Sequence, residues 1–104
     1  MSYSQRVTTL TGIAGSRLAD TDGLAGVLLA AAGAIGMSSH GPPIVRSGPR
    51  GIVACLLCHG GHVVVHTVPD QSLCIVDILA LEPSIANRGV EVIAKRLNGT
   101  VERS

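Results

Sequence analysis

Aromatic side chains and charges are both scarce in this sequence of 104 residues. Tyr3 is the only aromatic residue apart from four histidines, because Phe and Trp are absent. Charged residues make up 14% of the chain, whereas an average globular domain has about 25%. Eight basic and seven acidic residues nearly cancel, and the longest basic run is the pair Lys95-Arg96. Nucleic-acid-binding proteins usually show a basic stripe with stacking aromatics, so we expect no nucleic-acid partner.

Long apolar segments are missing as well. The apolar run over residues 24–37 is shorter than the roughly 20 residues that a membrane-spanning helix needs. Residues 1–10 are polar and lack the apolar stretch that is typical of a secretion signal. The three cysteines, an odd number, are expected to be reduced thiols. These features favour a cytoplasmic protein with no membrane contact.

Apolar residues, in contrast, are abundant, at 46% of the chain. A chain of this size buries only part of the surface that its unfolded form exposes. The segment 52–58 is apolar at every position, and would therefore be apolar on both faces of a strand. We expect part of this apolar surface to lie at a subunit interface, which predicts a homodimer. The alternative is a compact monomeric core rich in Ala, Val and Leu.

The pattern of apolar residues and turn signals predicts alternating strands and helices. The predicted strands are residues 6–14, 44–46, 52–58, 62–68, 73–79 and 100–102. Thr21 and Asp22 can cap a first helix that ends near Gly36, and Pro83 can open a second that ends at Asn98-Gly99. Turns are predicted at Gly60-Gly61 and at residues 69–72. We therefore predict one α+β domain over residues 1–104, a two-layer sandwich whose antiparallel sheet carries both helices on one face.

Two patterns in the centre of the chain suggest metal chemistry, and geometry disfavours both. Cys55-Leu56-Leu57-Cys58-His59 matches the pattern of covalent haem attachment. However, residues three apart on a strand point to opposite faces, so the two thiols would diverge. We expect both cysteines to act as small buried side chains and no haem to be attached.

A zinc site is the second possibility, because histidines and cysteines crowd into this region. Structural zinc needs four converging ligands. His62 and His66 would share a strand face, yet they would lie roughly 13 Å apart, too far to bind one ion together. A site formed by Cys58, His59 and His62 around the hairpin stays open as an alternative. No second pair of spaced cysteines supports it, so we expect no metal.

The segment His62-Val63-Val64-Val65-His66-Thr67-Val68-Pro69-Asp70, with the strand that leads to Asp77, resembles the signature of bacterial S-adenosylmethionine decarboxylases. In that family a strand leads to a Glu-Ser-His hairpin, followed by apolar residues, His-Thr, an aromatic residue and Pro-Glu. The next strand there ends in Asp, two apolar residues, Thr and Cys. The resemblance covers nearly the whole chain, and it implies the same two-layer sandwich and a dimer.

The sequence also departs from this family pattern. Members cleave themselves before the serine of Glu-Ser-His, which becomes a pyruvoyl group, but this chain has Gly60-Gly61-His62 there. Gly61 has no hydroxyl to attack the preceding carbonyl and no β-carbon to become the pyruvoyl methyl group. Leu81 stands at the position of the family's catalytic cysteine, and Val68 at that of an adenine-stacking aromatic. The resemblance therefore implies a chain that stays uncleaved, has no pyruvoyl cofactor and binds S-adenosylmethionine weakly or not at all.

Two functions of different class follow from this comparison. In the first, the old pocket serves another reaction on a small polar molecule. We then expect His66 as the main acid-base residue, helped by Asp70 and His62, with Cys58 as a reserve nucleophile. The residues expected to line the substrate pocket are His59, Gly60, Gly61 and Val68. In the second, the chain is a non-catalytic homologue that binds a ligand or pairs with an active decarboxylase. A hydrogen-bonding role between strands is the plain alternative for any single histidine.

Overall fold

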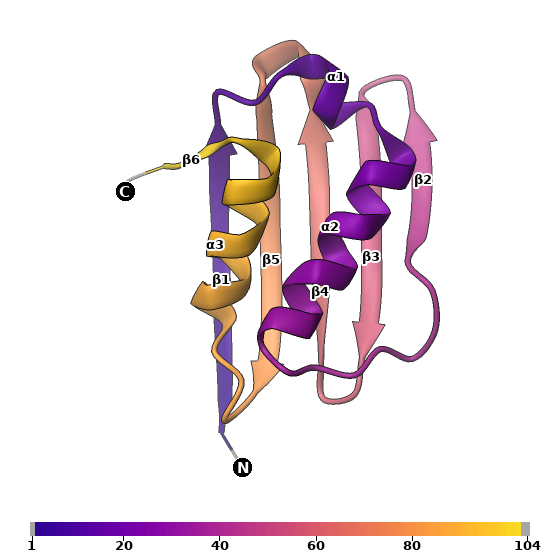
Figure 1. Cartoon of the computed structure of the whole chain (residues 1–104). Helices are drawn as coiled ribbons and strands as arrows, with labels where there is room; N and C mark the ends of the chain where they lie inside the picture. The colour runs from indigo at the N-terminus through magenta and orange to yellow at the C-terminus, as the bar shows by residue number, and fades with distance from the viewer. Residues whose placement is uncertain (1, 103–104) are drawn as a thin grey trace.

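A computed structural model describes residues 2–102, which form one sheet with helices on one side (Figure 1). The elements in chain order are β1 (Tyr3–Thr11), α1 (Gly15–Leu18), α2 (Thr21–Ala34), β2 (Ile44–Gly48), β3 (Gly51–Cys58), β4 (Gly61–Val68), the 3-10 turn η1 (Pro69–Gln71), β5 (Leu73–Leu81), α3 (Ala86–Leu97) and β6 (Thr100–Val101). The strand order is β2-β3-β4-β5-β1-β6, and every neighbouring pair is antiparallel. The predicted α+β sandwich with an antiparallel sheet is confirmed.

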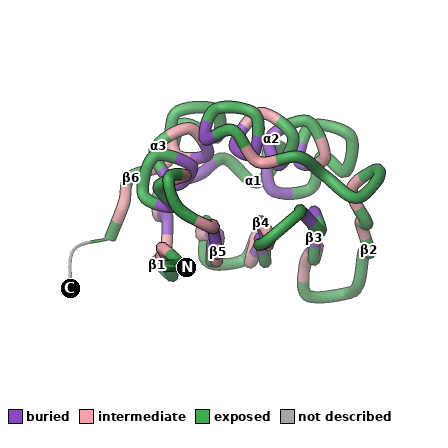
Figure 2. The backbone as a smooth tube through the Cα atoms, turned by 90° about the horizontal axis from the view of Figure 1, so that it is seen from below, coloured by how far each residue is buried: buried purple, intermediate pink, exposed green. Residues whose placement is uncertain are grey.

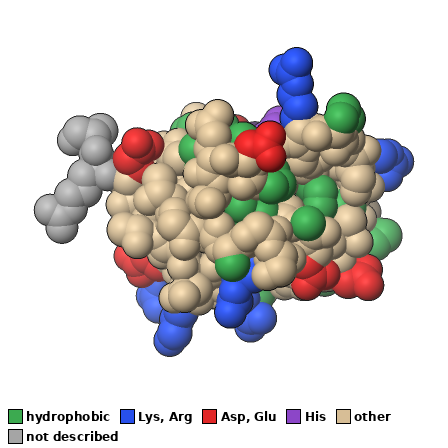
Figure 3. Space-filling view, turned by 90° about the horizontal axis from the view of Figure 1, so that it is seen from above, with side chains coloured by type: hydrophobic (Ala, Val, Ile, Leu, Met, Phe, Trp, Pro, Cys, Tyr) green, Lys and Arg blue, Asp and Glu red, His purple; other side chains and the backbone are tan. Residues whose placement is uncertain are grey.

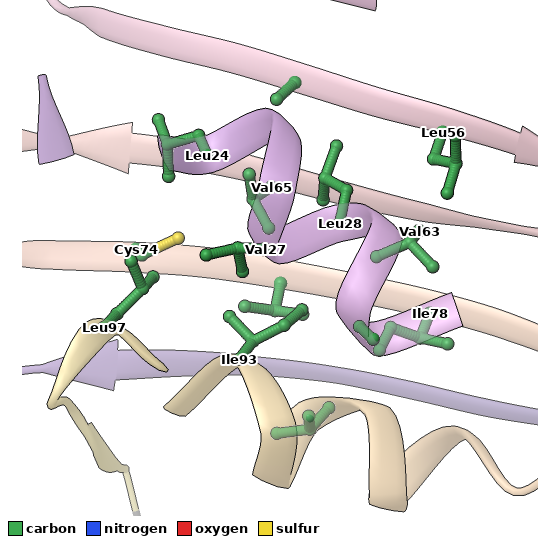
Figure 4. Close-up of a cluster of buried hydrophobic side chains, with 14 of the residues drawn as sticks. Leu24, Val27, Leu28, Leu56, Val63, Val65, Cys74, Ile78, Ile93 and Leu97 are labelled. Carbon is green, nitrogen blue, oxygen red and sulfur yellow. The ribbon is translucent and has the colours of Figure 1, made fainter. Parts of the chain in front are cut away.

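The two long helices, α2 and α3, lie next to each other over the same face of the sheet, which Figure 2 shows edge-on. Between the layers is a core of aliphatic side chains (Figure 4). Among its fully covered members are Leu24 and Leu28 from α2, Ile93 from α3, and Val65 and Ile78 from the sheet. Burying a side chain of this kind stabilises the fold by about 1.5–3 kcal/mol. This core fixes one face of every central strand against the helices.

Several element boundaries differ from the sequence prediction. β1 begins at Tyr3 and ends at Thr11, because it pairs with β5 along its length and Gly12 then turns the chain with φ of +71°. The cap of α2 is Asp20, whose Oδ1 accepts the Gly23 N–H at 2.9 Å; the prediction of Thr21 and Asp22 was wrong by one or two residues.

The second helix also starts later than predicted, at Ala86 and not at Pro83. Residues 82–84 form a turn, in which the Ser84 N–H donates to the Leu81 carbonyl at 3.1 Å. The first helical N–H, that of Ala86, donates to the Ser4 hydroxyl of β1 at 3.0 Å. A side chain distant in the sequence therefore fixes this helix end, which local sequence rules could not reveal.

The hairpin between β3 and β4 is shifted by one residue from its predicted place. Its two turn residues are His59 and Gly60, and Gly60 has φ of +79°, which favours glycine. Gly61 is already the first residue of β4 and pairs with Cys58. Gly61 is therefore a strand residue, and a positive φ does not explain the glycine at this position.

Within residues 2–102, no helix covers the second face of the sheet, which we call the open face (Figure 2). Side chains alternate along β3 and β5 between the buried core and this face. Large apolar side chains exposed on the open face are Tyr3, Val7, Ile44, Val53, Leu57 and Ile75. The open face is therefore both apolar and accessible in the single chain.

Candidate functional site on the open face

The open face carries both histidines of β4. Residues 62, 64, 66 and 68 alternate with the buried Val63 and Val65, so His62 and His66 lie on the same face, as predicted. His62 is partly buried, whereas His66 is exposed. Four residues of strand separate them by roughly 13 Å. The two imidazoles therefore belong to two different neighbourhoods.

His62 lies beside Asp77 of β5. Its Nε2 atom is 3.3 Å from Asp77 Oδ2. On the other side of the carboxylate, Gln5 Nε2 of β1 donates a hydrogen bond to Asp77 Oδ1 at 3.2 Å. The sheet register explains the cluster: His62 is opposite Leu79, so Asp77 is its diagonal neighbour on the same face. Three adjacent strands thus bring an imidazole, a carboxylate and an amide together.

The environment of the His62 ring favours one of the two neutral tautomers of the imidazole. Nε2 is covered by other atoms and makes no hydrogen bond of good geometry, although the Asp77 carboxylate is near. A lone pair facing a carboxylate is unfavourable and an N–H facing it is favourable, so we assign the proton to Nε2. Nδ1 is then the nitrogen that can exchange protons with another molecule. A carboxylate that orients an imidazole in this way is a common arrangement in acid-base catalysis.

His66 lies at the opposite end of β4, in a groove of about 650 Å³. The groove is bounded by the β2–β3 hairpin, with Arg46 and Arg50, and by the ends of β4 and β5. The Ile52 N–H donates to the buried Thr67 hydroxyl at 3.0 Å, and the β3–β4 register begins only at Val53. This side-chain hydrogen bond holds the hairpin near β4 at the point where the regular strand pairing stops.

Two other residues predicted for the site lie at this end. Val68 lines the same groove as His66. Asp70 lies in η1, exposed, and lines a neighbouring groove of about 240 Å³ together with Arg50. The structure therefore does not place Asp70 in the His66 groove, so it gives no support to the prediction that this carboxylate orients His66.

The structure separates Cys58 from the histidines. Its side chain points toward the helices and is 5% exposed, whereas Cys55 is on the open face; the two thiols diverge as predicted. Burial raises the pKa of the Cys58 thiol, and the nearby Cys55 raises it further. A buried, protonated thiol is a poor nucleophile, so its expected role as a reserve nucleophile is not compatible with this position.

The hairpin residues expected to bind substrate lie beyond His62, at the end of β4 away from Val68. The exposed His59 packs against His40, with ring centroids 3.7 Å apart. A β-carbon on Gly61 would collide with the carbonyl oxygen of Leu79 and lie 3.2 Å from Met37 Sδ. Gly61 is therefore required by the close approach of β5, and it offers no side chain to a ligand.

Residues 2–102 contain neither a cluster of metal-binding side chains nor a helix suited to crossing a membrane. Across residues 2–102, no three His, Cys, Asp or Glu side chains converge as a metal site would need. Within the same residues, none of the helices has both the length and the apolar character for a membrane crossing.

Comparison with known proteins relates this geometry to a family. The sequence model of the S-adenosylmethionine decarboxylase family matches residues 5–103, almost the entire chain. The chain belongs to the S-adenosylmethionine decarboxylase family. The crystal structure of the adenosylmethionine decarboxylase from Aquifex aeolicus has the same fold, with a TM-score of 0.83 and 18% sequence identity. That match covers 96% of this chain and 84% of the other. Among curated proteins, none matches the sequence significantly.

The region matched by the family model includes the central hairpin and both histidines. Four other residues near the two histidines were not predicted from the sequence. They are Asp77 and Gln5, which surround His62, and Arg46 and Arg50, which line the His66 groove. Asp77 could have been found, because odd positions of β5 share the open face once the register is known. Gln5 and the arginines carry no motif, and only the folded sheet brings them to these sites.

Proposed function

We propose that this member of the S-adenosylmethionine decarboxylase family is an enzyme that acts on a small molecule in the cytoplasm without a pyruvoyl group. The observation that carries the proposal is the pair formed by His62 and Asp77 on the open face, 3.3 Å apart. Asp77 orients the imidazole, and Nδ1 accepts or delivers a proton at the substrate. A positioned acid-base group of this kind contributes about 10²–10⁴-fold to a reaction rate.

The residues present do not fit a pyruvoyl group. The family makes that group from a serine, and Gly61, at the matching position, has neither a hydroxyl nor a β-carbon. The Leu79 carbonyl oxygen occupies the space that a β-carbon would need. We therefore expect the purified protein to give one intact mass near 10.6 kDa. Two fragments separated between Gly60 and Gly61 would contradict this part of the proposal.

Turnover can be tested without knowing the substrate. The protein is incubated with a bacterial metabolite extract, and consumption of each compound is followed by liquid chromatography and mass spectrometry. We expect at least one compound to be converted by the wild type and to be converted about 10²-fold more slowly by His62→Gln and by Asp77→Asn. His40→Gln, at an exposed histidine outside the pair, is the matched control and should keep full activity. Equal turnover by all four proteins would show that the pair is not catalytic.

We also propose that two copies associate through the open face, so that the His62–Asp77 pair of each copy faces the space between the two sheets and acts on a substrate held there. Its exposed apolar side chains, among them Val53, Leu57 and Ile75, form a surface that another apolar sheet face would cover. Sedimentation at micromolar concentration should show a dimer for the wild type and a folded monomer for Ile75→Asp. A wild-type monomer, or an Ile75→Asp variant that still dimerises, would count against this interface.

The same apolar face supports a second function, that of a non-catalytic subunit. A sheet face that pairs with its own copy can also pair with that of a related chain, so the protein could associate with an active decarboxylase. The test is co-purification with an S-adenosylmethionine decarboxylase from the same cell, followed by a decarboxylation assay with and without this chain. A changed rate, together with no turnover in the metabolite assay, would favour this second function.

A further inference from the structure

Asp77 lies between two imidazoles on the open face. His62 is opposite Leu79 on β5, and His66 is opposite Ile75. Asp77 is midway between these two residues of β5, so it is a diagonal neighbour of each histidine. Within residues 2–102, however, Asp77 forms an ion pair with His62 only. The register therefore allows two partners for this carboxylate, of which the folded chain uses one.

The amide of Gln5 contacts the same carboxylate from β1. Gln5 is opposite Leu79, so it lies in the same row across the sheet as His62. Its Nε2 donates to Asp77 Oδ1 at 3.2 Å, while Asp77 Oδ2 is 3.3 Å from His62 Nε2. An ionised carboxylate only accepts hydrogen bonds, so the amide must present its NH₂ group to it. Each oxygen of Asp77 is thus directed to one group, the amide on β1 or the imidazole on β4.

The row that contains His66 offers no matching group. Its residue on β1 is Thr9, which is opposite Ile75. In the part of the chain that the structure describes, the Thr9 hydroxyl forms no hydrogen bond with Asp77. A threonine hydroxyl lies close to its own backbone, whereas the longer glutamine side chain can reach across to a diagonal neighbour. Only the row of Gln5 therefore supplies a donor that can hold the carboxylate.

Other charges do not orient Asp77. Arg6 follows Gln5 on β1, but the alternation of the strand directs it to the helix face. Arg46 on β2 is three strands away, roughly 14 Å at the usual strand spacing. Figure 3 looks at the end of the molecule where α1 and η1 lie, and most charged side chains there are at its rim. Exposed charges more than about 8 Å apart are largely screened at physiological ionic strength. The orientation of Asp77 therefore depends on its contacts with Gln5 and His62.

We infer that Gln5 is a positioning residue, which holds Asp77 toward His62 and away from His66. A hydrogen bond to a charged group is about twice as strong as one between neutral groups. With Asp77 fixed, the ring proton of His62 stays on Nε2, and Nδ1 remains available to accept a proton from a substrate. The inference rests on the proposed function for the statement that this base is catalytic. All three side chains of the cluster belong to one chain, so it forms whether or not a second copy covers the open face.

Positioning is tested by nuclear magnetic resonance of the full chain with isotope-labelled histidines. In the wild type the ring proton of His62 should be on Nε2 and exchange slowly with water, because this atom is covered and faces a carboxylate. Gln5→Met removes the donor and keeps a side chain of similar length. We expect it to make this exchange about tenfold faster or more, the scale of a hydrogen bond to a charged group. Gln5→Glu cannot donate when ionised and repels Asp77, so its effect should be at least as large.

The matched control is Thr9→Val, which removes a polar group from the same strand in the row of His66. It should leave the exchange rate of the His62 proton unchanged. Circular dichroism should show all three variants folded, because neither position belongs to the core. Unchanged exchange in both Gln5 variants would show that the sheet alone fixes Asp77, and the inference would be overturned. An equal change in Thr9→Val would also overturn it, since the effect would not depend on the amide.

Turnover separates positioning from catalysis. With the compound that the metabolite assay identifies, Gln5→Met should lower kcat by about tenfold and leave KM unchanged, a smaller loss than that of His62→Gln. If the exchange rate changes as described but His62→Gln leaves turnover unchanged, the acid-base proposal fails and the positioning of Asp77 by Gln5 stands. If His62→Gln abolishes turnover but Gln5→Met changes neither the exchange rate nor kcat, the positioning inference fails and the acid-base proposal stands.

Discussion

Opposite faces of the same strands have different compositions in this protein. On β5, Ile78 points toward the helices and is fully buried, while Ile75, three residues earlier, points to the open face and is 40% exposed. The helix face of the central strands is almost entirely aliphatic, with Thr67 as its one buried polar side chain in residues 2–102. The open face mixes apolar side chains with His62, Asp77 and His66.

The two faces of the sheet therefore contribute differently to the protein. The helix face provides the free energy of folding, because its side chains leave water when the chain folds. The open face keeps polar groups among apolar ones, at a distance from the core. Residues can therefore change on the open face without loss of the fold, which is how a family fold can persist while the chemistry on its surface changes.

The largest expected effect is the difference between the two isoleucines of β5. Ile78→Ala should lower the free energy of unfolding by about 2–5 kcal/mol, because it leaves a cavity beneath α3, where Ile78 lies close to Gly89. Ile75→Ala should cost about 1 kcal/mol or less, since the side chain is already partly in water. Urea titrations followed by circular dichroism, at a protein concentration low enough for monomers, measure both values.

The same pair also tests the proposed interface. Association stabilises the folded state by mass action. If the loss of unfolding free energy in Ile75→Ala becomes larger at higher protein concentration, the additional loss comes from weakened dimerisation. Equal losses for the two variants in the monomer would show that the open face is not the accessible surface described above.

A smaller effect is expected at Gly61, on the helix side of β4. Gly61→Ser restores the residue type that the family uses for self-cleavage, yet its β-carbon would collide with the Leu79 carbonyl oxygen. We expect it to destabilise the protein by about 1–3 kcal/mol, the usual cost of overpacking, and to leave the chain uncleaved. Intact mass and thermal unfolding measure the two outcomes, with Gly26→Ser, where a β-carbon meets open space, as the matched control.

Cleavage of Gly61→Ser at residue 60 would lead to a different conclusion. It would mean that this fold keeps the machinery for making a pyruvoyl group and lacks only the serine hydroxyl. The uncleaved state would then be a consequence of a single substitution and not of the way β5 packs against the hairpin.

The architecture was predictable because the apolar pattern is strong and punctuated. The strand at 52–58 and the stripe of α3, from Ala86 to Leu97, are both found where the sequence places them. The ends of elements were less predictable, because distant groups fix them. The Ser4 hydroxyl sets the start of α3 from β1, and no local signal near residue 86 indicates this.

The candidate site was predicted only in part, for a similar reason. Period-two alternation correctly placed His62 and His66 on one face. It could not give the pairing between strands, which brings Asp77 beside His62 and separates Asp70 from the His66 groove. It also indicated nothing about Arg46 and Arg50, which approach His66 only because β2 folds back along β3.

The last expected effect, again a difference between the two faces, concerns pH. Cys74 is fully buried on the helix face of β5, and burial raises the pKa of its thiol to about 12 from an ordinary value of 9.0. In the unfolded chain this thiol ionises from about pH 9, while in the folded protein it stays protonated up to about pH 12. Between these values the unfolded state binds fewer protons, so the free energy of unfolding should fall with rising pH, by at most about 1.4 kcal/mol per pH unit from this group.

Urea titrations from pH 8 to pH 11 check this expectation by comparing the wild type with Cys74→Ala and Cys55→Ala. Below pH 9 the Cys74 contribution is fully present, and Cys74→Ala should show only the pH-independent cost of the lost side chain. Above pH 9 the curves of the wild type and Cys74→Ala should converge, because the wild type alone loses stability through this thiol. Cys55→Ala removes a thiol from the open face, where it is partly exposed, and should keep most of the wild-type slope. Parallel curves for the wild type and Cys74→Ala would show that the helix face does not hold this thiol in its neutral form.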